Sequence, residues 1–247
     1  MTIDPDSSRL VRFSDKSRPR ALLLQGPVGT FFNHLQRELE LKGFNAWRVC
    51  FNAADTLYSR RYKRVHFLGG LARWEKRLRG SLVAGDLDVI VLFGSERPAH
   101  QIARRLAGEF EVPVLCLEEG YIRPGYITAE WGGNNAASPL GGRIPPDDFV
   151  AVDSAPPVAY KSFGVMGLTA FLYFTVRTIF TWGPNRQLFH RSISPVYDGF
   201  CWIRNGYRRL VGQYRNFSII QQILEYHDHR FFLVPLQVAA DSNLKDA

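Results

Sequence analysis

Cysteine is scarce in this chain and forms no recognisable pattern. The 247 residues include three cysteines, Cys50, Cys116 and Cys201, which are widely spaced and contain no Cys-x-x-Cys pair. An odd number of cysteines among apolar neighbours such as Val49 and Leu115 is typical of small, reduced core residues. The six histidines show no metal-ligand spacing. We therefore expect neither a disulfide scaffold nor a metal site.

A secretory signal is also missing. The first twenty residues mix Asp, Ser, Arg and Pro, and no apolar stretch of the required length follows a basic start. The sequence has no internal repeat or low-complexity tract, and its 46% apolar and 22% charged residues are ordinary globular composition. We expect residues 1–20 to be a flexible polar leader and the protein to be cytoplasmic.

Acidic residues are fewer than basic residues. The 31 Lys and Arg against 23 Asp and Glu leave a formal net charge of +8. Such an excess suits an anionic partner, which can be a nucleotide, a nucleic acid or an acidic membrane surface. Because the basic residues are spread over several segments and no familiar nucleic-acid-binding signature occurs, we expect no nucleic-acid partner.

One long apolar segment, Phe163–Trp182, carries a single charge, Arg177. Its length is close to the roughly 20 residues that cross a bilayer. Arg177 lies deep in the segment, where insertion costs about 2.5–3.5 kcal/mol. Three interpretations stay open, namely a buried or partly buried helix, a helix lying in the membrane interface, and a true span. Tyr173 and Trp182, with basic residues nearby, favour the interface over the span.

Apolar runs alternate with helical patterns through the first half of the chain. Strands are predicted at Ala21–Gln25, Ala46–Phe51, Asp88–Phe93 and Val112–Leu117, and helices at Thr30–Lys42, Arg73–Val83 and Pro98–Phe110. This alternation predicts right-handed βαβ units around a parallel sheet. Residues 21–150 are therefore expected to form an N-terminal Rossmann-like domain of the α/β class.

The second half has a different pattern. Gly and Pro clusters from Gly132 to Pro157 predict a long loop, and a helical stretch covers Gly199–Tyr226. We expect residues 151–228 to be a helical, membrane-associating insertion. Arg230–Gln237 resumes the strand pattern. It either completes the first sheet or opens a second Rossmann-like domain, at residues 229–247.

The first candidate site is the turn that follows the first predicted strand. Gly26, Gly29 and Thr30 open a helix there, where free N–H groups and the helix dipole favour an anion. The turn is neither a Walker A loop nor a full GxGxxG motif. In parallel α/β sheets ligands bind at the carboxyl ends of the strands, and this turn lies at such an end. An ordinary glycine turn is the alternative.

The second candidate follows the strand predicted at Val112–Leu117. Glu118 and Glu119 are adjacent carboxylates, and either one can accept a hydrogen bond from a sugar hydroxyl or take part in acid–base chemistry. Arg123 is suited to clamp a phosphate or carboxylate. The alternative is a solvated acidic turn, and the sequence leaves open which of the two glutamates is functional.

The third candidate lies near the end of the chain, where Gln237 and Asp241 follow the strand pattern of Arg230–Gln237. A carboxylate at this position would face a cleft at the strand ends. Taken alone the signal is weak, and a plain surface loop is the alternative.

Three segments together resemble one known family. LLLQGPVGTFF, LEEGYIRPGYITAEWGGNNAAS and FFLVPLQVAADSN are similar to bacterial capsule polysaccharide biosynthesis and export proteins, cytoplasmic enzymes that place Kdo (3-deoxy-manno-octulosonic acid) on a membrane phospholipid. The resemblance implies a GT-B-like glycosyltransferase that uses CMP-Kdo as donor, needs no further cofactor and forms β-Kdo linkages with retention. It also implies a (lyso)phosphatidylglycerol acceptor, a peripheral position at the inner membrane and other capsule assembly proteins as partners.

The resemblance also suggests residue roles. Glu118 would contact donor or acceptor, Asp241 would be the catalytic carboxylate and a candidate nucleophile, and Gln237 would belong to the glutamine motif before it. Gly26, Gly29, Thr30, Glu119 and Arg123 would complete the substrate-binding set.

The sequence departs from the family pattern in one respect. The family continues into a second Rossmann-like domain with a His-Pro motif for the nucleotide sugar, and no His-Pro dipeptide occurs here. We therefore expect a truncated chain with weak or no transferase activity on its own. Two alternatives remain, a GT-B enzyme with another nucleotide sugar and a non-catalytic, membrane-associated subunit of an export assembly.

Overall fold

The computed structural model describes residues 8–11, 13, 17–59, 61–120, 126–140, 163–180, 183–188, 195–226 and 232. The chain divides into two compact units, residues 1–192 and residues 193–247. The strand pattern at Arg230–Gln237 and the second Rossmann-like domain expected at residues 229–247 lie outside the described residues, apart from Phe232.

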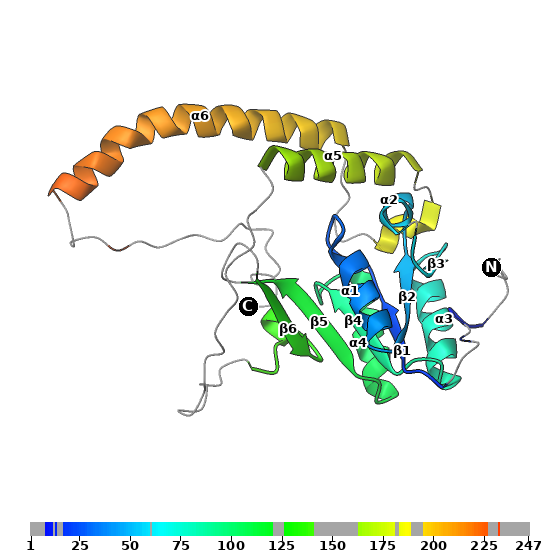
Figure 1. Cartoon of the computed structure of the whole chain (residues 1–247). Coiled ribbons are helices and arrows are strands. Elements are labelled where there is room, and N and C mark those ends of the chain that lie inside the picture. Colours follow the sequence, from blue (N-terminus) through cyan, green and yellow to red (C-terminus); the bar gives the residue numbers. More distant parts are fainter. Residues whose placement is uncertain are drawn as a thin grey trace, which may run out of the picture. The chain divides into compact units, whose positions relative to one another are not determined.

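The first unit is built on a six-stranded sheet with the order β3-β2-β1-β4-β5-β6 (Figure 1). The strands are β1 (Arg20–Leu23), β2 (Asn45–Cys50), β3 (Arg64–His66), β4 (Val89–Phe93), β5 (Val114–Glu119) and β6 (Ile127–Trp131). Neighbouring strands are parallel except for β5 and β6, which are antiparallel. The prediction of a Rossmann-like α/β domain is confirmed, with an antiparallel edge strand that was not expected.

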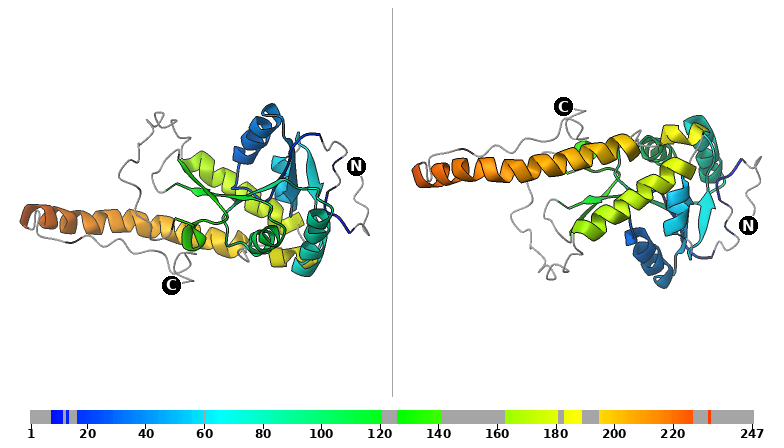
Figure 2. Two further views of the ribbon diagram at one scale, coloured as in Figure 1. Left: turned by 90° about the horizontal axis from the view of Figure 1, so that it is seen from below. Right: turned by 90° about the horizontal axis from the view of Figure 1, so that it is seen from above.

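Helices cover both faces of this sheet. Those that follow strands are α1 (Phe31–Leu41), α2 (Ala53–Tyr58), α3 (Leu71–Val83) and α4 (Pro98–Glu109), and α5 (Phe163–Phe180) comes later in the chain. Short 3-10 turns occur at η1 (Asn135–Ala137) and η2 (Gly183–Leu188). Figure 2 shows α1 on one side of the sheet and α3 and α4 on the other.

Each face of the sheet has its own apolar core, because successive strand residues point to opposite faces. Leu22 and Ile90 pack on the α3 and α4 side, where Trp74 is completely buried. Leu23 and Val91 pack on the α1 side against Phe32. Burial on both faces explains why these strands are continuous apolar runs in the sequence.

Part of the predicted leader belongs to the core. Leu10, Val11 and Phe13 are buried with the α3 and α4 cluster, and the Leu10 N–H donates to Ser81 Oγ at 2.9 Å. Arg9 also pairs with Asp86 at 3.6 Å. The expectation of a flexible leader is therefore wrong for these residues. Removing the apolar side chains of Leu10, Val11 and Phe13 from water stabilises the fold.

Helix α5 contacts α2 and shows two different faces. Tyr173 and Arg177, four residues apart, are buried, and the Arg177 guanidinium lies 4.9 Å from the centre of the Phe174 ring. Leu168 and Phe171 are more than half exposed. The charge that argued against membrane insertion therefore faces the protein, as expected of a partly buried helix. In the described part of the chain no helix is long and apolar enough to cross a membrane.

The second unit is described through one long helix, α6 (Pro195–Tyr226). This confirms the helical prediction for Gly199–Tyr226. Exposed apolar residues recur along it at alternating spacings of three and four, namely at Phe200, Ile203, Tyr207, Leu210, Tyr214 and Phe217.

Candidate functional site at the carboxyl ends of β1, β4 and β5

Strands β1 and β4 are the centre of the sheet, and the chain leaves them in opposite directions. From β1 it passes to α1 on one face, and from β4 it passes to α4 on the other. The loops after the two strands therefore diverge and open a crevice at the carboxyl ends, which is where open α/β sheets bind ligands.

The loop between β1 and α1 needs its glycines. Gly29 has φ of +117°, which side chains other than hydrogen rarely tolerate. A Cβ placed on Gly26 would lie 2.5 Å from Cγ of Phe32, so Gly26 lets that ring pack beneath the loop. Thr30 is the N-cap residue of α1 but makes no side-chain cap bond. Gly26, Gly29 and Thr30 thus lie where the sequence predicts them, at the start of α1.

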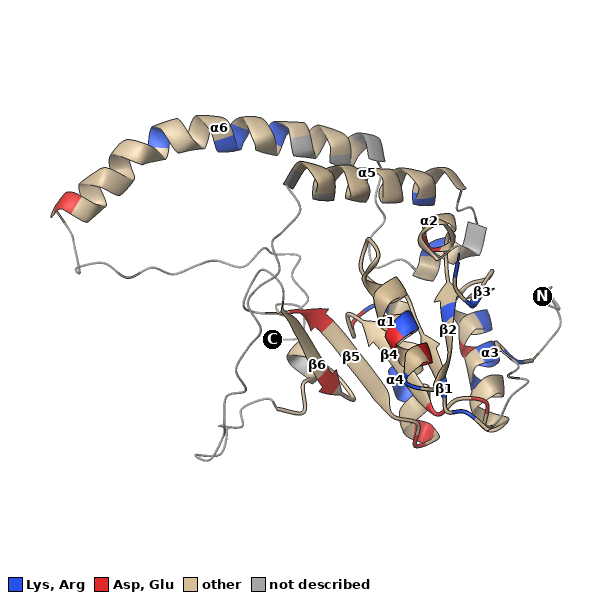
Figure 3. Ribbon diagram, in the orientation of Figure 1, with Lys and Arg blue, Asp and Glu red and all other residues tan. Residues whose placement is uncertain are grey.

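Glu118 and Glu119 are the last residues of β5 rather than the turn after it. The strand runs two residues further than predicted because β6 pairs with it, with Glu118 opposite Thr128. Glu118 is half-buried, whereas Glu119 is exposed and points to the other face of the strand. Figure 3 shows this acidic tip of β5.

Arg97 is a residue of this site that sequence reasoning missed. It precedes Pro98, and its Nη1 donates to the carbonyl oxygens of Gln25 at 3.4 Å and Gly26 at 3.5 Å. A Cβ placed on Gly94 would lie 3.5 Å from both Arg97 Nε and Glu118 Oε2, so the two side chains flank one point.

Burial lowers the pKa of the Arg97 guanidinium, and the negative charges of Asp55 and Glu118 oppose this. Arg97 therefore connects the first and second predicted sites. An arginine at the end of a glycine-containing loop after a buried strand is the sequence signal that would have found it.

Asp55 was also missed by the sequence analysis. Asn52 caps α2 by accepting from the Asp55 N–H at 3.0 Å, and Asp55 Oδ2 accepts from the Phe51 N–H at 3.1 Å and from Asn52 Nδ2 at 2.9 Å. This reciprocal arrangement differs from a capping box in that Asp55 accepts from the N–H of Phe51, one residue before the N-cap Asn52. Its sequence signal is Asn52 followed three residues later by Asp55.

Asp55 also joins α5 to the sheet. The Tyr173 hydroxyl donates to Asp55 Oδ1 at 2.6 Å and accepts from Gln25 Nε2 at 3.0 Å. Burial raises the pKa of the Asp55 carboxyl, against the opposing effect of the hydrogen bond from Tyr173. The sequence could not show this network because Asp55 and Tyr173 are 118 residues apart.

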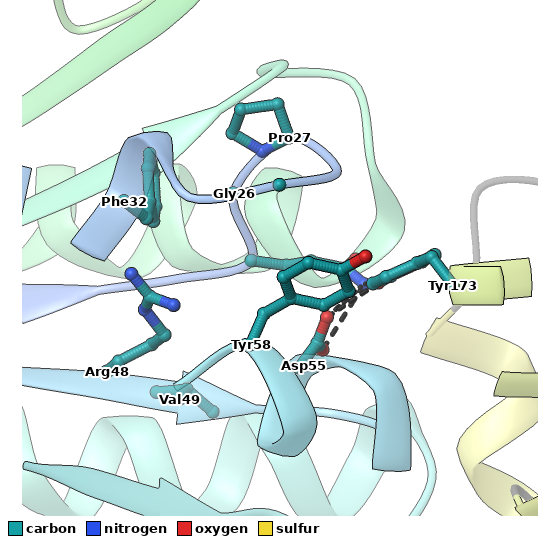
Figure 4. Close-up of a pocket in the computed structure, with 10 residues that line it drawn as sticks. Gly26, Pro27, Phe32, Arg48, Val49, Asp55, Tyr58 and Tyr173 are labelled. Atoms are coloured by element: carbon teal, nitrogen blue, oxygen red, sulfur yellow. Dashed lines mark hydrogen bonds between the residues drawn. The ribbon is translucent and has the colours of Figure 1, made fainter. Parts of the chain in front are cut away.

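A small hollow lies under the β1–α1 loop. Figure 4 shows its lining, which comes from the β1–α1 loop, α1, β2, α2 and α5. The residues are Gln25, Gly26, Pro27, Gly29, Phe32, Arg48, Val49, Asp55, Tyr58 and Tyr173. In this hollow Arg48, a cation from β2, lies close to the predicted glycine turn.

The remaining predicted site residues, Arg123, Gln237 and Asp241, lie outside the described residues. The convergence of Asp241 with Glu118 therefore stays a prediction. In the described ranges no three His, Cys, Asp or Glu side chains gather in a way that could hold a metal ion.

The fold and the candidate site define a Rossmann-like α/β domain with charged side chains at the carboxyl ends of its central strands. A family model described as "Capsule polysaccharide biosynthesis protein" matches residues 88–247. The chain belongs to this family, which confirms the resemblance found in the sequence.

Individual relatives agree with the family match. The capsule polysaccharide export protein KpsS of Escherichia coli is 32% identical over 236 residues, which cover 93% of this chain and 60% of that protein. The capsule polysaccharide modification protein LipB of Neisseria meningitidis serogroup B is 30% identical over 244 residues, covering 93% of this chain and 57% of LipB. The chain thus spans about 60% of the length of these relatives.

Proposed function

We propose that the protein is a capsule glycosyltransferase with a GT-B-like fold that transfers Kdo from CMP-Kdo, with retention, to a (lyso)phosphatidylglycerol acceptor. The observation that supports this most is the placement of Glu118 beside Arg97 at the carboxyl ends of β5 and β4. Membership of the capsule polysaccharide biosynthesis family agrees with it.

The chemistry requires groups for a departing phosphate and for an acceptor hydroxyl. Transfer breaks the bond from the anomeric carbon of Kdo to the phosphate of CMP and forms a bond to the acceptor oxygen, whose proton must be taken up. Arg97 and the N-terminus of α1 are suited to the negative charge of the phosphate. Glu118 is suited to bind the hydroxyl and accept its proton.

Retention by a covalent route needs an ionised carboxylate at the anomeric carbon. In our proposal Asp241 supplies it, with Gln237 and Arg123 binding substrate. Glu119 points away from the Glu118 face, so we assign the acid–base role to Glu118.

The exposed face of α5 supports a place at the membrane. Leu168, Phe171 and Leu172 are 60%, 56% and 49% exposed. Apolar side chains on one side of a helix, in a protein of positive net charge, suit the interface of an anionic membrane. We propose that α5 contacts the cytoplasmic surface of the inner membrane, near the lipid acceptor.

Transfer by the complete gene product that carries these residues tests the proposal. The protein is incubated with lyso-phosphatidylglycerol and either CMP-Kdo or UDP-sugars, and the product is identified by mass. We expect a lipid heavier by one Kdo residue from CMP-Kdo alone. Product from a UDP-sugar would identify another glycosyltransferase, and vesicle binding without transfer from any donor would favour a non-catalytic docking subunit.

A further inference from the structure

Arg48 of β2 is a buried cation with unused hydrogen-bonding capacity. Its exposed fraction is 5%, and it lines the hollow under the β1–α1 loop. Its Nε and Nη2 have no hydrogen-bond partner among the residues that the structure describes. Guanidinium groups stay protonated in proteins, so these N–H groups belong to a charged side chain that is shielded from water. Such a charge normally has a partner.

The unused edge of Arg48 is the one that binds two oxygens at once. Arg20 shows this geometry in the same sheet, where its Nε and Nη2 donate to the two carboxylate oxygens of Asp88 at 2.8 and 2.9 Å. Arginine forks of this kind recognise carboxylate and phosphate groups. Arg48 therefore presents an unoccupied fork for an oxyanion.

The surroundings keep this fork in place. The Arg48 guanidinium lies 5.5 Å from the centre of the Phe32 ring, and Gly26 leaves room for that ring beneath the loop. Figure 4 shows the guanidinium extending from β2 toward Phe32, with Gly26 and Pro27 closing the hollow above. Arg97 adds a second cation at the carbonyl groups of Gln25 and Gly26.

The carboxylate that also lines the hollow is already occupied. Asp55 Oδ1 and Oδ2 accept hydrogen bonds from Gln25, Phe51, Asn52 and Tyr173. Arg48 is therefore the cation in the lining that is left to pair with an anion.

We propose that this hollow is a phosphate-binding subsite in which Arg48 holds the phosphate of the lipid acceptor's headgroup. The assignment to the acceptor rests on the proposed function. Tyr173, which lines the hollow, belongs to α5, whose other face exposes Leu168 and Phe171. A phosphate at Arg48 would therefore lie beside the helix that is suited to contact acyl chains.

The test follows the arginine Nε–H resonances of the 247-residue chain by NMR during titration. The Arg48 signal is assigned by its absence in Arg48→Lys. With glycerol 3-phosphate we expect a saturable shift of this signal, weaker with inorganic phosphate. Arg48→Met should weaken glycerol 3-phosphate binding at least tenfold, measured by titration calorimetry because this variant has no Arg48 signal. Arg37→Met, which removes an exposed cation from α1, should change it less than twofold.

Each other outcome overturns the proposal. An Arg48 signal unchanged by both phosphates would mean that the fork pairs inside the protein, with Asn33 Oδ1 or Gln36 Oε1, which also lack partners in the described residues. If CMP shifted the Arg48 signal as much as glycerol 3-phosphate does, the subsite would bind the phosphate of the sugar donor. If free Kdo shifted it more, the subsite would bind a carboxylate and not a phosphate. Because the wild-type titration needs no transfer, failure of this subsite and failure of the proposed activity are separate results.

Discussion

At the scale of single residues, burial decides which groups can react. Cys50 and Cys116 are buried, and burial raises the pKa of each thiol to about 11. Cys50 Sγ also lies 3.2 Å from Ser59 Oγ. Cys201 is partly exposed on α6. The expectation of reduced core cysteines, made from their apolar neighbours, is therefore confirmed for the first two.

These thiols should differ sharply in reactivity. Because the thiolate is the nucleophile, a thiol with a pKa of about 11 is almost entirely protonated at pH 8. We expect a maleimide to modify Cys201 of the folded chain first, and Cys50 and Cys116 after addition of denaturant. Mass spectrometry of timed samples measures this, and equal labelling of all three in the native state would contradict the burial.

His66 should make stability depend on pH. Burial and the charge of Arg64 lower its pKa, and Arg64 Nε donates to His66 Nε2 at 3.3 Å, which requires a neutral ring. Because the folded state resists protonation, stability is lost as pH falls below the ordinary value of about 6.5 toward the lower folded value. The urea midpoint of the wild type should fall more between pH 7.5 and 5.5 than that of His66→Gln, and parallel changes would contradict this role.

At the scale of elements, the buried hydroxyl of Tyr173 helps to hold α5 to the domain. Tyr173→Phe removes the hydrogen bond to Asp55 and leaves a buried carboxyl less satisfied, so we expect a loss of about 1–3 kcal/mol in the free energy of unfolding. Tyr207→Phe, on the exposed surface of α6, is the control and should be neutral. Urea denaturation measures both, and equal stability of the two variants would show that Tyr173 does not anchor α5.

The outer face of α5 should determine membrane binding. Replacing Leu168 and Phe171 with glutamate puts charge on exposed positions, so we expect weaker sedimentation with phosphatidylglycerol vesicles and an unchanged thermal midpoint. Tyr214→Glu, at an exposed position of α6, is the control for added negative charge. Vesicle binding that stays at the wild-type level in the α5 variant would remove this helix from the interface.

The elements that sequence predicted well are those with strong patterns. The strands β1, β2, β4 and β5 are apolar runs, and the helices α1, α3 and α4 agree with prediction to within two residues at each end. α2 and β3 were missed because six and three residues are too short for a periodicity to appear. β6 was missed because it is an edge strand, without the apolar run of the buried ones.

The candidate site was predicted only where its residues follow a strand in sequence. Gly26, Gly29, Thr30 and Glu118 could be found in this way, because parallel strands end at the same edge of a sheet. Arg48 could not, because it lies inside β2 and its role depends on the loop that covers it. Arg97 depends likewise on carbonyl groups of the β1–α1 loop, more than 70 residues away in sequence.

At the scale of the whole molecule, the parallel strands bring charged residues from distant segments of the sequence together at their carboxyl ends. The cations of β2 and of the β4–α4 loop lie on either side of the β1–α1 loop, and Glu118 ends β5 beside Arg97. We propose that this arrangement binds the anionic substrate and accepts a proton at the carboxyl ends of the strands.

The central claim is that Glu118 acts in sugar transfer, and replacing it in the complete gene product tests this most directly. The rate of Kdo transfer from CMP-Kdo to lyso-phosphatidylglycerol is measured for the wild type, Glu118→Gln and Glu111→Gln. Glu111 is exposed at the other end of β5 and serves as the matched control. We predict that Glu118→Gln lowers the rate about 100-fold or more, while Glu111→Gln stays within about twofold. Transfer by Glu118→Gln at the wild-type rate would contradict the account.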